Sequence, residues 1–207
     1  MINGARKIMK ERKESNTMKL NKIVMIIFRI AEICYWVGTA MCAVITGGIA
    51  MGQTSIITLL SDVDPSAGRD LVAFGFSIFP VDSQGNPVKG AYLIFFIAMV
   101  LMMVLMAMVC RNIYLIFKTS AGETSFSKGQ TPFQPDNIRM VREIGIFLMA
   151  IPVVGLIMSV VSRIALAGME VETSVDLHFV MIGLAMICLS RFFAYGMELQ
   201  DDVDGLV

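Results

Sequence analysis

The chain has 207 residues, carries no formal net charge at pH 7, and is 56% hydrophobic. Its mean hydropathy of +0.73 is too high for a soluble domain of this size, which excludes the usual small water-soluble enzymes and binding modules. Four apolar stretches account for it, at residues 23–51, 91–117, 141–161 and 175–195. A helix needs about 20 mainly apolar residues to cross a bilayer. We therefore predict an all-α membrane protein, an antiparallel bundle of four transmembrane helices within residues 23–195.

Charge is distributed unevenly around these stretches. Residues 1–22 hold seven Lys and Arg against two Glu, and the segment 118–140 is also basic. The loops 53–90 and 162–174 carry more acidic than basic residues. Because Lys and Arg concentrate in cytoplasmic flanks, the pattern predicts cytoplasmic N- and C-termini and two external loops. Residues 1–22 are then a basic cytoplasmic arm, in which residues 1–17 are either disordered or helical.

The first span contains two charged residues, Arg29 and Glu32, which are three apart and share a helix face. A charge inside a membrane helix is costly and is often functional. Two alternatives remain open for this polar pair: an interfacial position from which Arg29 reaches the headgroups, or a buried polar site in the bundle. Small residues spaced by four follow in the same span and predict a close approach of another helix. These are Ala43 with Gly47, and Gly48 with Gly52.

The first external loop, residues 53–90, is long for a connection within a helical bundle. Val72, Phe74, Phe76 and Ile78 alternate in a way that places them on one side of a strand. Turn-forming residues crowd positions 82–87. Residues 55–60 suit either a partner strand or the end of the first helix. We predict a small β-containing extracellular cap, which seals the bundle or binds an external ligand.

The segment before the third span has the most distinctive local pattern. Pro132 and Pro135 keep the chain extended before a helix start that Asp136 or Asn137 is expected to cap. Arg139, Arg142 and Glu143 follow on neighbouring turns of that helix. This cytoplasmic elbow, residues 118–140, is either a partner-binding segment or an ordinary basic flank of a membrane helix.

The chain ends in an acidic segment, residues 196–207, which we predict to be a cytoplasmic tail. Its acidic residues are Glu198, Asp201, Asp202 and Asp204. They suit pairing with Arg139, Arg142 or the basic N-terminal arm, although such surface pairs contribute only about 0–1 kcal/mol each. A solvated tail is the alternative.

The elbow and the tail together resemble a bacterial family of four-helix membrane proteins, the domain of unknown function 2975 or YoaS-like family. The elbow motif is matched by Pro132, Phe133, Asp136, Asn137, Ile138, Arg139, Arg142 and Gly145. The tail motif is matched more loosely, by Gly196, Leu199, Gln200, Asp202, Asp204 and Val207. The resemblance implies a multi-pass protein of the bacterial cytoplasmic membrane. Because members are often encoded beside a small helix-turn-helix DNA-binding protein, it also implies a membrane-bound regulator.

The sequence thus predicts a non-enzymatic regulatory or scaffolding protein that binds a cytoplasmic partner, such as a small helix-turn-helix transcription regulator. The predicted partner-binding residues are Pro132, Phe133, Asp136, Asn137, Arg139, Arg142, Glu143, Leu199, Gln200, Asp202 and Asp204. The alternative is a small oligomeric transporter or channel that uses Arg29 and Glu32. We expect no catalytic residues, metal or cofactor, and no direct binding of nucleic acid. The lipid bilayer and further copies of the chain complete the expected partners.

Overall fold

The computed structural model describes residues 2–53, 55–58, 71–82, 84, 86–125, 127, 131–166 and 176–205, with only the backbone described for 2–18 and Asp204. The long helices are α1 (Ile2–Ala50), α3 (Lys89–Ser120), α4 (Pro135–Ala165) and α5 (Leu177–Asp204). Within the described residues, four helical segments are long and apolar enough to cross a membrane. The coarse prediction of a helical protein with four such segments is therefore confirmed.

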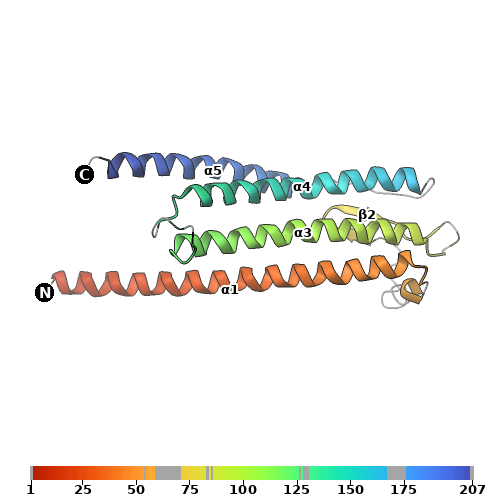
Figure 1. Ribbon diagram of the computed structural model, residues 1–207, viewed down its shortest axis with the longest axis horizontal. Helices are drawn as coiled ribbons and strands as arrows, with labels where there is room; N and C mark the ends of the chain where they lie inside the picture. The colour runs from red at the N-terminus through yellow and green to blue at the C-terminus, as the bar shows by residue number, and fades with distance from the viewer. Residues whose placement is uncertain are drawn as a thin grey trace.

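The helices follow one another in a row (Figure 1). α1 packs against α3, α3 against α4, and α4 against α5, with consecutive helices running in opposite directions. The two outer helices, α1 and α5, make no comparable contact with each other, so the row does not close into a ring. Both chain ends lie at one end of the molecule, which we call the termini end. The opposite end, which carries a small β-hairpin, we call the hairpin end.

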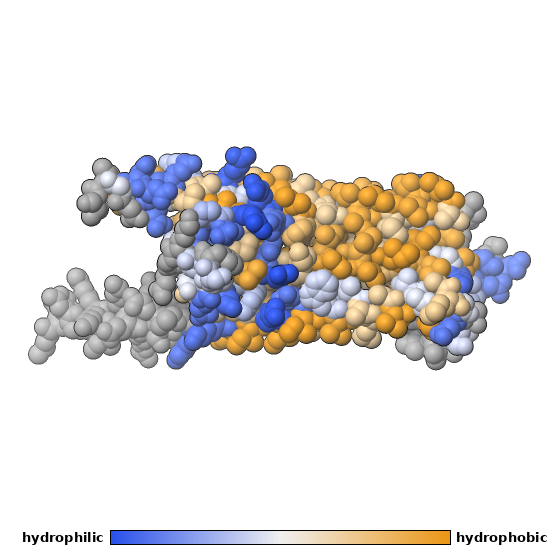
Figure 2. Space-filling view, viewed as in Figure 1, coloured by the Kyte–Doolittle hydropathy of each residue, from blue (hydrophilic) through white to orange (hydrophobic). Residues whose placement is uncertain are grey.

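Apolar side chains cover the middle of the molecule, and polar ones gather at its ends (Figure 2). The inner helices α3 and α4 supply much of the core, including Met102, Ile144 and Ile151. The outer helices instead expose large apolar side chains, such as Val44 on α1 and Phe192 on α5. Apolar surface of this extent is rare on a monomer in water and marks contact with lipid or with another protein.

α4 and α5 approach each other closely at two glycines. A Cβ added at Gly145 would lie 2.6 Å from the Gly183 carbonyl oxygen, and one added at Gly183 would lie 2.8 Å from the Gly145 carbonyl oxygen. Only glycine allows the two backbones to meet in this way.

The glycines that the sequence singled out for such a contact do not make it. A Cβ at Gly47 would meet nothing within 4 Å, and Gly48 packs against the Ile56 side chain of the segment that follows α1. Gly52 lies just beyond the end of α1 with φ +89°, a conformation that glycine adopts without strain. Gly145 and Gly183, which do make such a contact, have no Gly, Ala or Ser four residues away, so the spacing of small residues does not identify the helices that meet closely.

Strands β1 (Leu71–Ala73) and β2 (Phe76–Ile78) form the antiparallel hairpin. Phe74 and Gly75 occupy the turn, both with positive φ, as a tight two-residue hairpin turn requires. The predicted single strand over residues 72–78 is therefore wrong, because the turn reverses the chain in its middle. Val72 is exposed, whereas Phe76 and Ile78 are fully buried. Residues 55–58 form a helical turn, and positions 59–60 lie outside the described residues.

Several helix limits differ from the predicted ones. α1 begins at Ile2, so the backbone of the predicted N-terminal arm continues the first helix. α4 extends to Ala165, beyond the predicted loop start at 162, and most of that loop lies outside the described residues. α5 continues to Asp204, so most of the predicted tail is helical.

The start of α4 also differs. Its N-cap is Gln134, with Pro135 in the first turn, and neither Asp136 nor Asn137 caps the helix. Proline suits this position because its missing N–H would have no partner there anyway. The proline that was expected only to extend the chain therefore begins the helix itself.

Candidate functional site at the termini end

The elbow between α3 and α4 packs directly on the last turns of α5. The Phe133 ring lies against Gly196, where an added Cβ would be 2.6 Å from a ring carbon. The centroids of the Phe133 and Phe193 rings are 5.7 Å apart. Beside them, Thr131 Oγ1 donates a hydrogen bond to Gln200 Oε1 at 3.0 Å. The elbow and tail motifs, more than 60 residues apart in the sequence, thus form one structural unit.

Buried amides hold the elbow in shape from inside. Asn137 has no exposed surface, and its Nδ2 donates to Ser120 Oγ at 3.1 Å and to the Pro132 carbonyl oxygen at 2.9 Å. Gln134 is equally buried, and its Nε2 donates to the Thr131 carbonyl oxygen at 2.7 Å. These bonds tie the end of α3 and the elbow to the start of α4. Asn137 therefore has a structural position, not the exposed one that partner binding requires.

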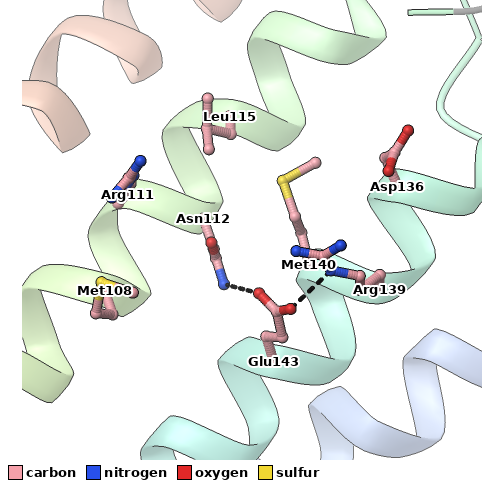
Figure 3. Close-up of a pocket in the computed structure, with 8 residues that line it drawn as sticks. All are labelled: Met108, Arg111, Asn112, Leu115, Asp136, Arg139, Met140 and Glu143. Atoms are coloured by element: carbon pink, nitrogen blue, oxygen red, sulfur yellow. Dashed lines mark hydrogen bonds and ion pairs between the residues drawn. The ribbon is translucent and has the colours of Figure 1, made fainter. Parts of the chain in front are cut away.

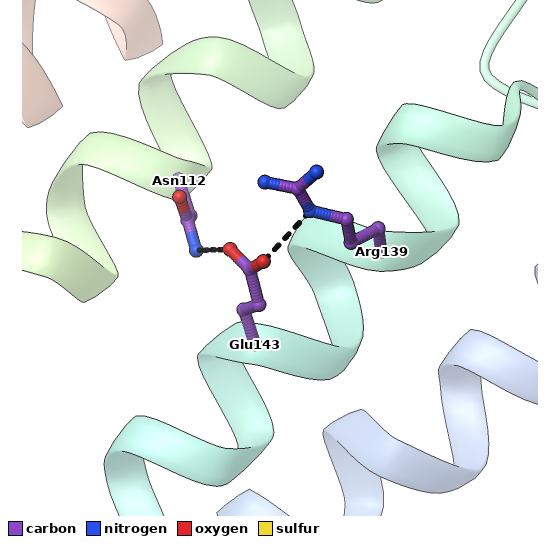
Figure 4. Close-up of polar contacts among 3 residues, drawn as sticks. All are labelled: Asn112, Arg139 and Glu143. Carbon is purple, nitrogen blue, oxygen red and sulfur yellow. Dashed lines mark hydrogen bonds and ion pairs between the residues drawn. The ribbon is translucent and has the colours of Figure 1, made fainter.

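A polar chain links α3 to α4 near the same end (Figure 4). Asn112 Nδ2 donates to one carboxylate oxygen of Glu143 at 3.1 Å. Arg139 Nε donates to the other oxygen at 2.8 Å. Asn112 is buried, whereas Arg139 is mostly exposed. Because each oxygen of Glu143 has a donor, its charge is satisfied between the two helices.

These residues line a pocket of about 450 Å³ between α3 and α4 (Figure 3). α3 contributes Met108, Arg111, Asn112 and Leu115, and α4 contributes Asp136, Arg139, Met140 and Glu143. The volume lies within the range of small-molecule binding pockets. The pocket combines two guanidinium groups, two carboxylates and an apolar wall, so it suits a ligand with both charged and apolar parts.

The pair Arg29 and Glu32 forms an ion pair, with Arg29 Nη1 donating to Glu32 Oε2 at 2.7 Å. Glu32 is only 5% exposed, while about half of the Arg29 side chain is accessible. The Arg29 guanidinium lies 5.4 Å from the centroid of the Tyr114 ring, a cation–π contact that joins α1 to α3. The Glu32 carboxylate is thus buried, as expected for a polar site inside the bundle. Its partner Arg29 reaches the surface, as expected for an interfacial pair.

The other predicted residues are more exposed. Arg142, Leu199 and Asp202 lie on the surface, and Gln200 is half-buried. Among the residues described with side chains, the acids of the α5 end form no ion pair with Arg139 or Arg142. Arg139 pairs instead with Glu143, four residues along its own helix. The predicted pairing of the tail with these arginines is absent there; the Asp204 side chain lies outside the described part.

Sequence reasoning missed four residues of this region: Asn112, Thr131, Gln134 and Phe193. Asn112 carried a signal, because it is an amide two residues after a long apolar run and buried amides need partners. Phe193 and Gln134 carried no such signal. An aromatic residue in a membrane span, such as Phe193, is ordinary, and so is a polar residue in a loop, such as Gln134. Their roles depend on a contact between segments that are distant in the sequence.

Comparisons of the chain with protein families, with curated proteins and with solved structures find no match.

Proposed function

We propose that this chain is a multi-pass membrane protein with a regulatory or scaffolding role, which binds a cytoplasmic protein at its termini end. The charge pattern supports this orientation. Among the described side chains, Lys22 precedes the apolar run of α1, Arg111 and Lys118 lie in the part of α3 next to the elbow, and Arg142 lies in the first turns of α4. These are the segments that the sequence predicts to be inside. The apolar zone between the two polar ends supports insertion into a bilayer.

The observation that carries the proposal is the contact of Phe133 with Gly196. It holds the elbow against α5, so that two exposed charged regions keep a fixed relative position. Arg142 lies on α4, and Glu198, Asp201 and Asp202 lie on the end of α5. A preorganised surface of mixed charge lowers the ordering cost of binding and favours one partner over others.

The partner class comes from the family resemblance. A small helix-turn-helix transcription regulator, held at the membrane or released from it, would join this chain to gene regulation without direct contact between this chain and DNA. The elbow motif and the α5 motif lie together in the fold, which is consistent with a shared role. Direct binding to nucleic acid is not part of the proposal, because the exposed end of α5 is acidic and would repel phosphates.

The test is a mild affinity purification from native membranes, followed by mass spectrometry. The wild-type protein is expected to recover a small helix-turn-helix protein. The Arg142→Ala/Asp202→Ala variant is expected to lose most of it, since both exposed charges are removed while the buried elbow contacts stay. Lys89→Ala is the matched control, because Lys89 is an exposed cation at the first residue of α3, the end of that helix opposite the elbow. Equal recovery with all three proteins, or recovery of none, contradicts the proposal.

A specific observation also favours the alternative function, a small oligomeric transporter or channel. Glu32 is a buried acid within an apolar helix, and such residues often lie on ion pathways. Glu32→Gln removes the charge with little change of shape. If the protein transports a solute, this variant is expected to lose flux in reconstituted vesicles while partner recovery stays unchanged. Unchanged solute flux in the Glu32→Gln variant would contradict the alternative function.

A further inference from the structure

The pocket between α3 and α4 lies where both helices change from apolar to charged sequence. Residues 91–110 of α3 and 144–162 of α4 contain no Asp, Glu, Lys or Arg. At the ends of these runs that face the elbow, the first charged residue is Arg111 on α3 and Glu143 on α4, and both line the pocket. If the apolar runs lie in the bilayer, as proposed above, the pocket opens at the level of the lipid headgroups on the termini side.

Only some of the charged groups that line the pocket are paired within the protein. Glu143 is satisfied by Asn112 and by Arg139 Nε. Arg139 keeps its terminal nitrogens, because a guanidinium has five N–H donors. Within the described part of the chain, Arg111 and Asp136 form no hydrogen bond or ion pair, although both line the pocket. One helix therefore supplies an unpaired cation, and the other supplies an unpaired anion beside Arg139.

This arrangement specifies the chemistry of a ligand. Two guanidinium groups on facing helices suit a phosphate, which they bind through paired donors. Asp136 suits an ammonium group and disfavours a second negative charge. Two cations and two carboxylates leave the pocket without net charge, so a zwitterion fits it better than an anion. Met108, Leu115 and Met140 provide an apolar wall next to the charged groups.

We propose that the pocket binds the phosphoethanolamine headgroup of a membrane phospholipid. The phosphate lies between Arg111 and Arg139, the ammonium group faces Asp136, and the glycerol and upper acyl chains contact the methionines and leucine. The same headgroup as a free water-soluble molecule shares this chemistry, so the test separates the two sources.

The experiment measures the phospholipid retained by the purified full-length protein. Protein extracted from membranes is exchanged into micelles with equal amounts of phosphatidylethanolamine and phosphatidylglycerol of identical acyl chains. Native mass spectrometry then counts each bound lipid. The wild type is expected to retain phosphatidylethanolamine preferentially. Arg111→Ala is expected to lower total retention about fivefold, the effect of one cation near a headgroup. Asp136→Asn is expected to remove the preference between the two lipids while total retention stays.

The controls are Arg191→Ala and Asp201→Asn, which remove an exposed cation and an exposed anion of α5 that do not line the pocket. Both are expected to retain lipid like the wild type. If Arg111→Ala fails to fold, Arg111→Lys keeps the positive charge but loses the paired donors, and it is expected to show a smaller loss. The unfolding midpoint of each variant is compared with that of the wild type. An unchanged midpoint shows that a loss of retained lipid does not come from a loss of folding.

Three results would overturn the proposal. The first is a wild type that shows no lipid preference or prefers phosphatidylglycerol. The second is pocket variants that behave like the α5 controls. The third is that free O-phosphoethanolamine displaces the retained lipid at concentrations near those of the lipid itself, which would assign the site to a soluble zwitterion.

Discussion

Asn137→Asp is expected to destabilise the protein by about 3–5 kcal/mol, the range for an uncompensated buried charge. The wild-type Asn137 Nδ2 donates both hydrogen bonds of this side chain, and its Oδ1 has no partner among the described residues. A carboxylate has no donor to replace Nδ2, so it would face the Pro132 carbonyl oxygen with a negative charge at a fully buried position. The measurement is the free energy of unfolding in detergent micelles.

Gln200→Glu provides the matched control, because it makes the same exchange of amide for carboxylate in the same region. Gln200 uses its oxygen as the acceptor from Thr131, and a carboxylate keeps that acceptor. Gln200 is also only half-buried, so we expect its variant to remain within about 1 kcal/mol of the wild type. Equal losses in the two variants would show that the Asn137 donors do not hold the elbow.

Gly145→Ala is expected to cost about 1–3 kcal/mol, as overpacking of a well-packed contact does. The added methyl group would lie 2.6 Å from the Gly183 carbonyl oxygen and 3.1 Å from the Ile187 backbone nitrogen. Backbone atoms cannot turn aside as a flexible side chain can, so α4 and α5 must separate. The same unfolding measurement reports the loss.

Gly47→Ala makes the same substitution in a helix where the new methyl group meets nothing within 4 Å. Alanine has the higher helix propensity, by about 1 kcal/mol, so this variant is expected to match or exceed the wild-type stability. A Gly145→Ala protein as stable as the Gly47→Ala protein would mean that the contact between α4 and α5 tolerates a wider separation than the structure has.

The helical content and the four long apolar segments could be predicted because each depends on a local run of residues. Residues 91–110, for example, contain no charge, and no tertiary information is needed to assign them to a long apolar helix. The hairpin was harder to predict from the sequence, since phenylalanine is a residue type typical of strands and Phe74 lies in the turn. Only its positive φ next to Gly75 reveals a turn.

The candidate site was predictable in its segments but not in its contacts. The motifs of the elbow and of the end of α5 predicted a shared site, and in the structure Phe133 contacts Gly196. The roles of individual residues depended on the fold: Asn137 lies inside the elbow, and Arg139 joins Glu143 and Asn112. Spacing alone does not identify the glycine that meets another helix: Gly47 has the small residue Ala43 four positions before it and Gly145 has none, yet Gly145 is the one that meets α5. What distinguishes them is the neighbour that each one meets.

The row of helices has a consequence for how the molecule assembles during synthesis. Each long helix after α1 packs on the long helix that precedes it in the chain, from α1 through α3 and α4 to α5. A newly made helix thus finds its docking surface already present, and none must wait for a segment that the ribosome has not yet made. Contacts between consecutive elements keep the contact order low, which favours rapid folding. The contacts of the elbow with Gly196 and Gln200 must wait for the last turns of α5, so the termini end is completed last.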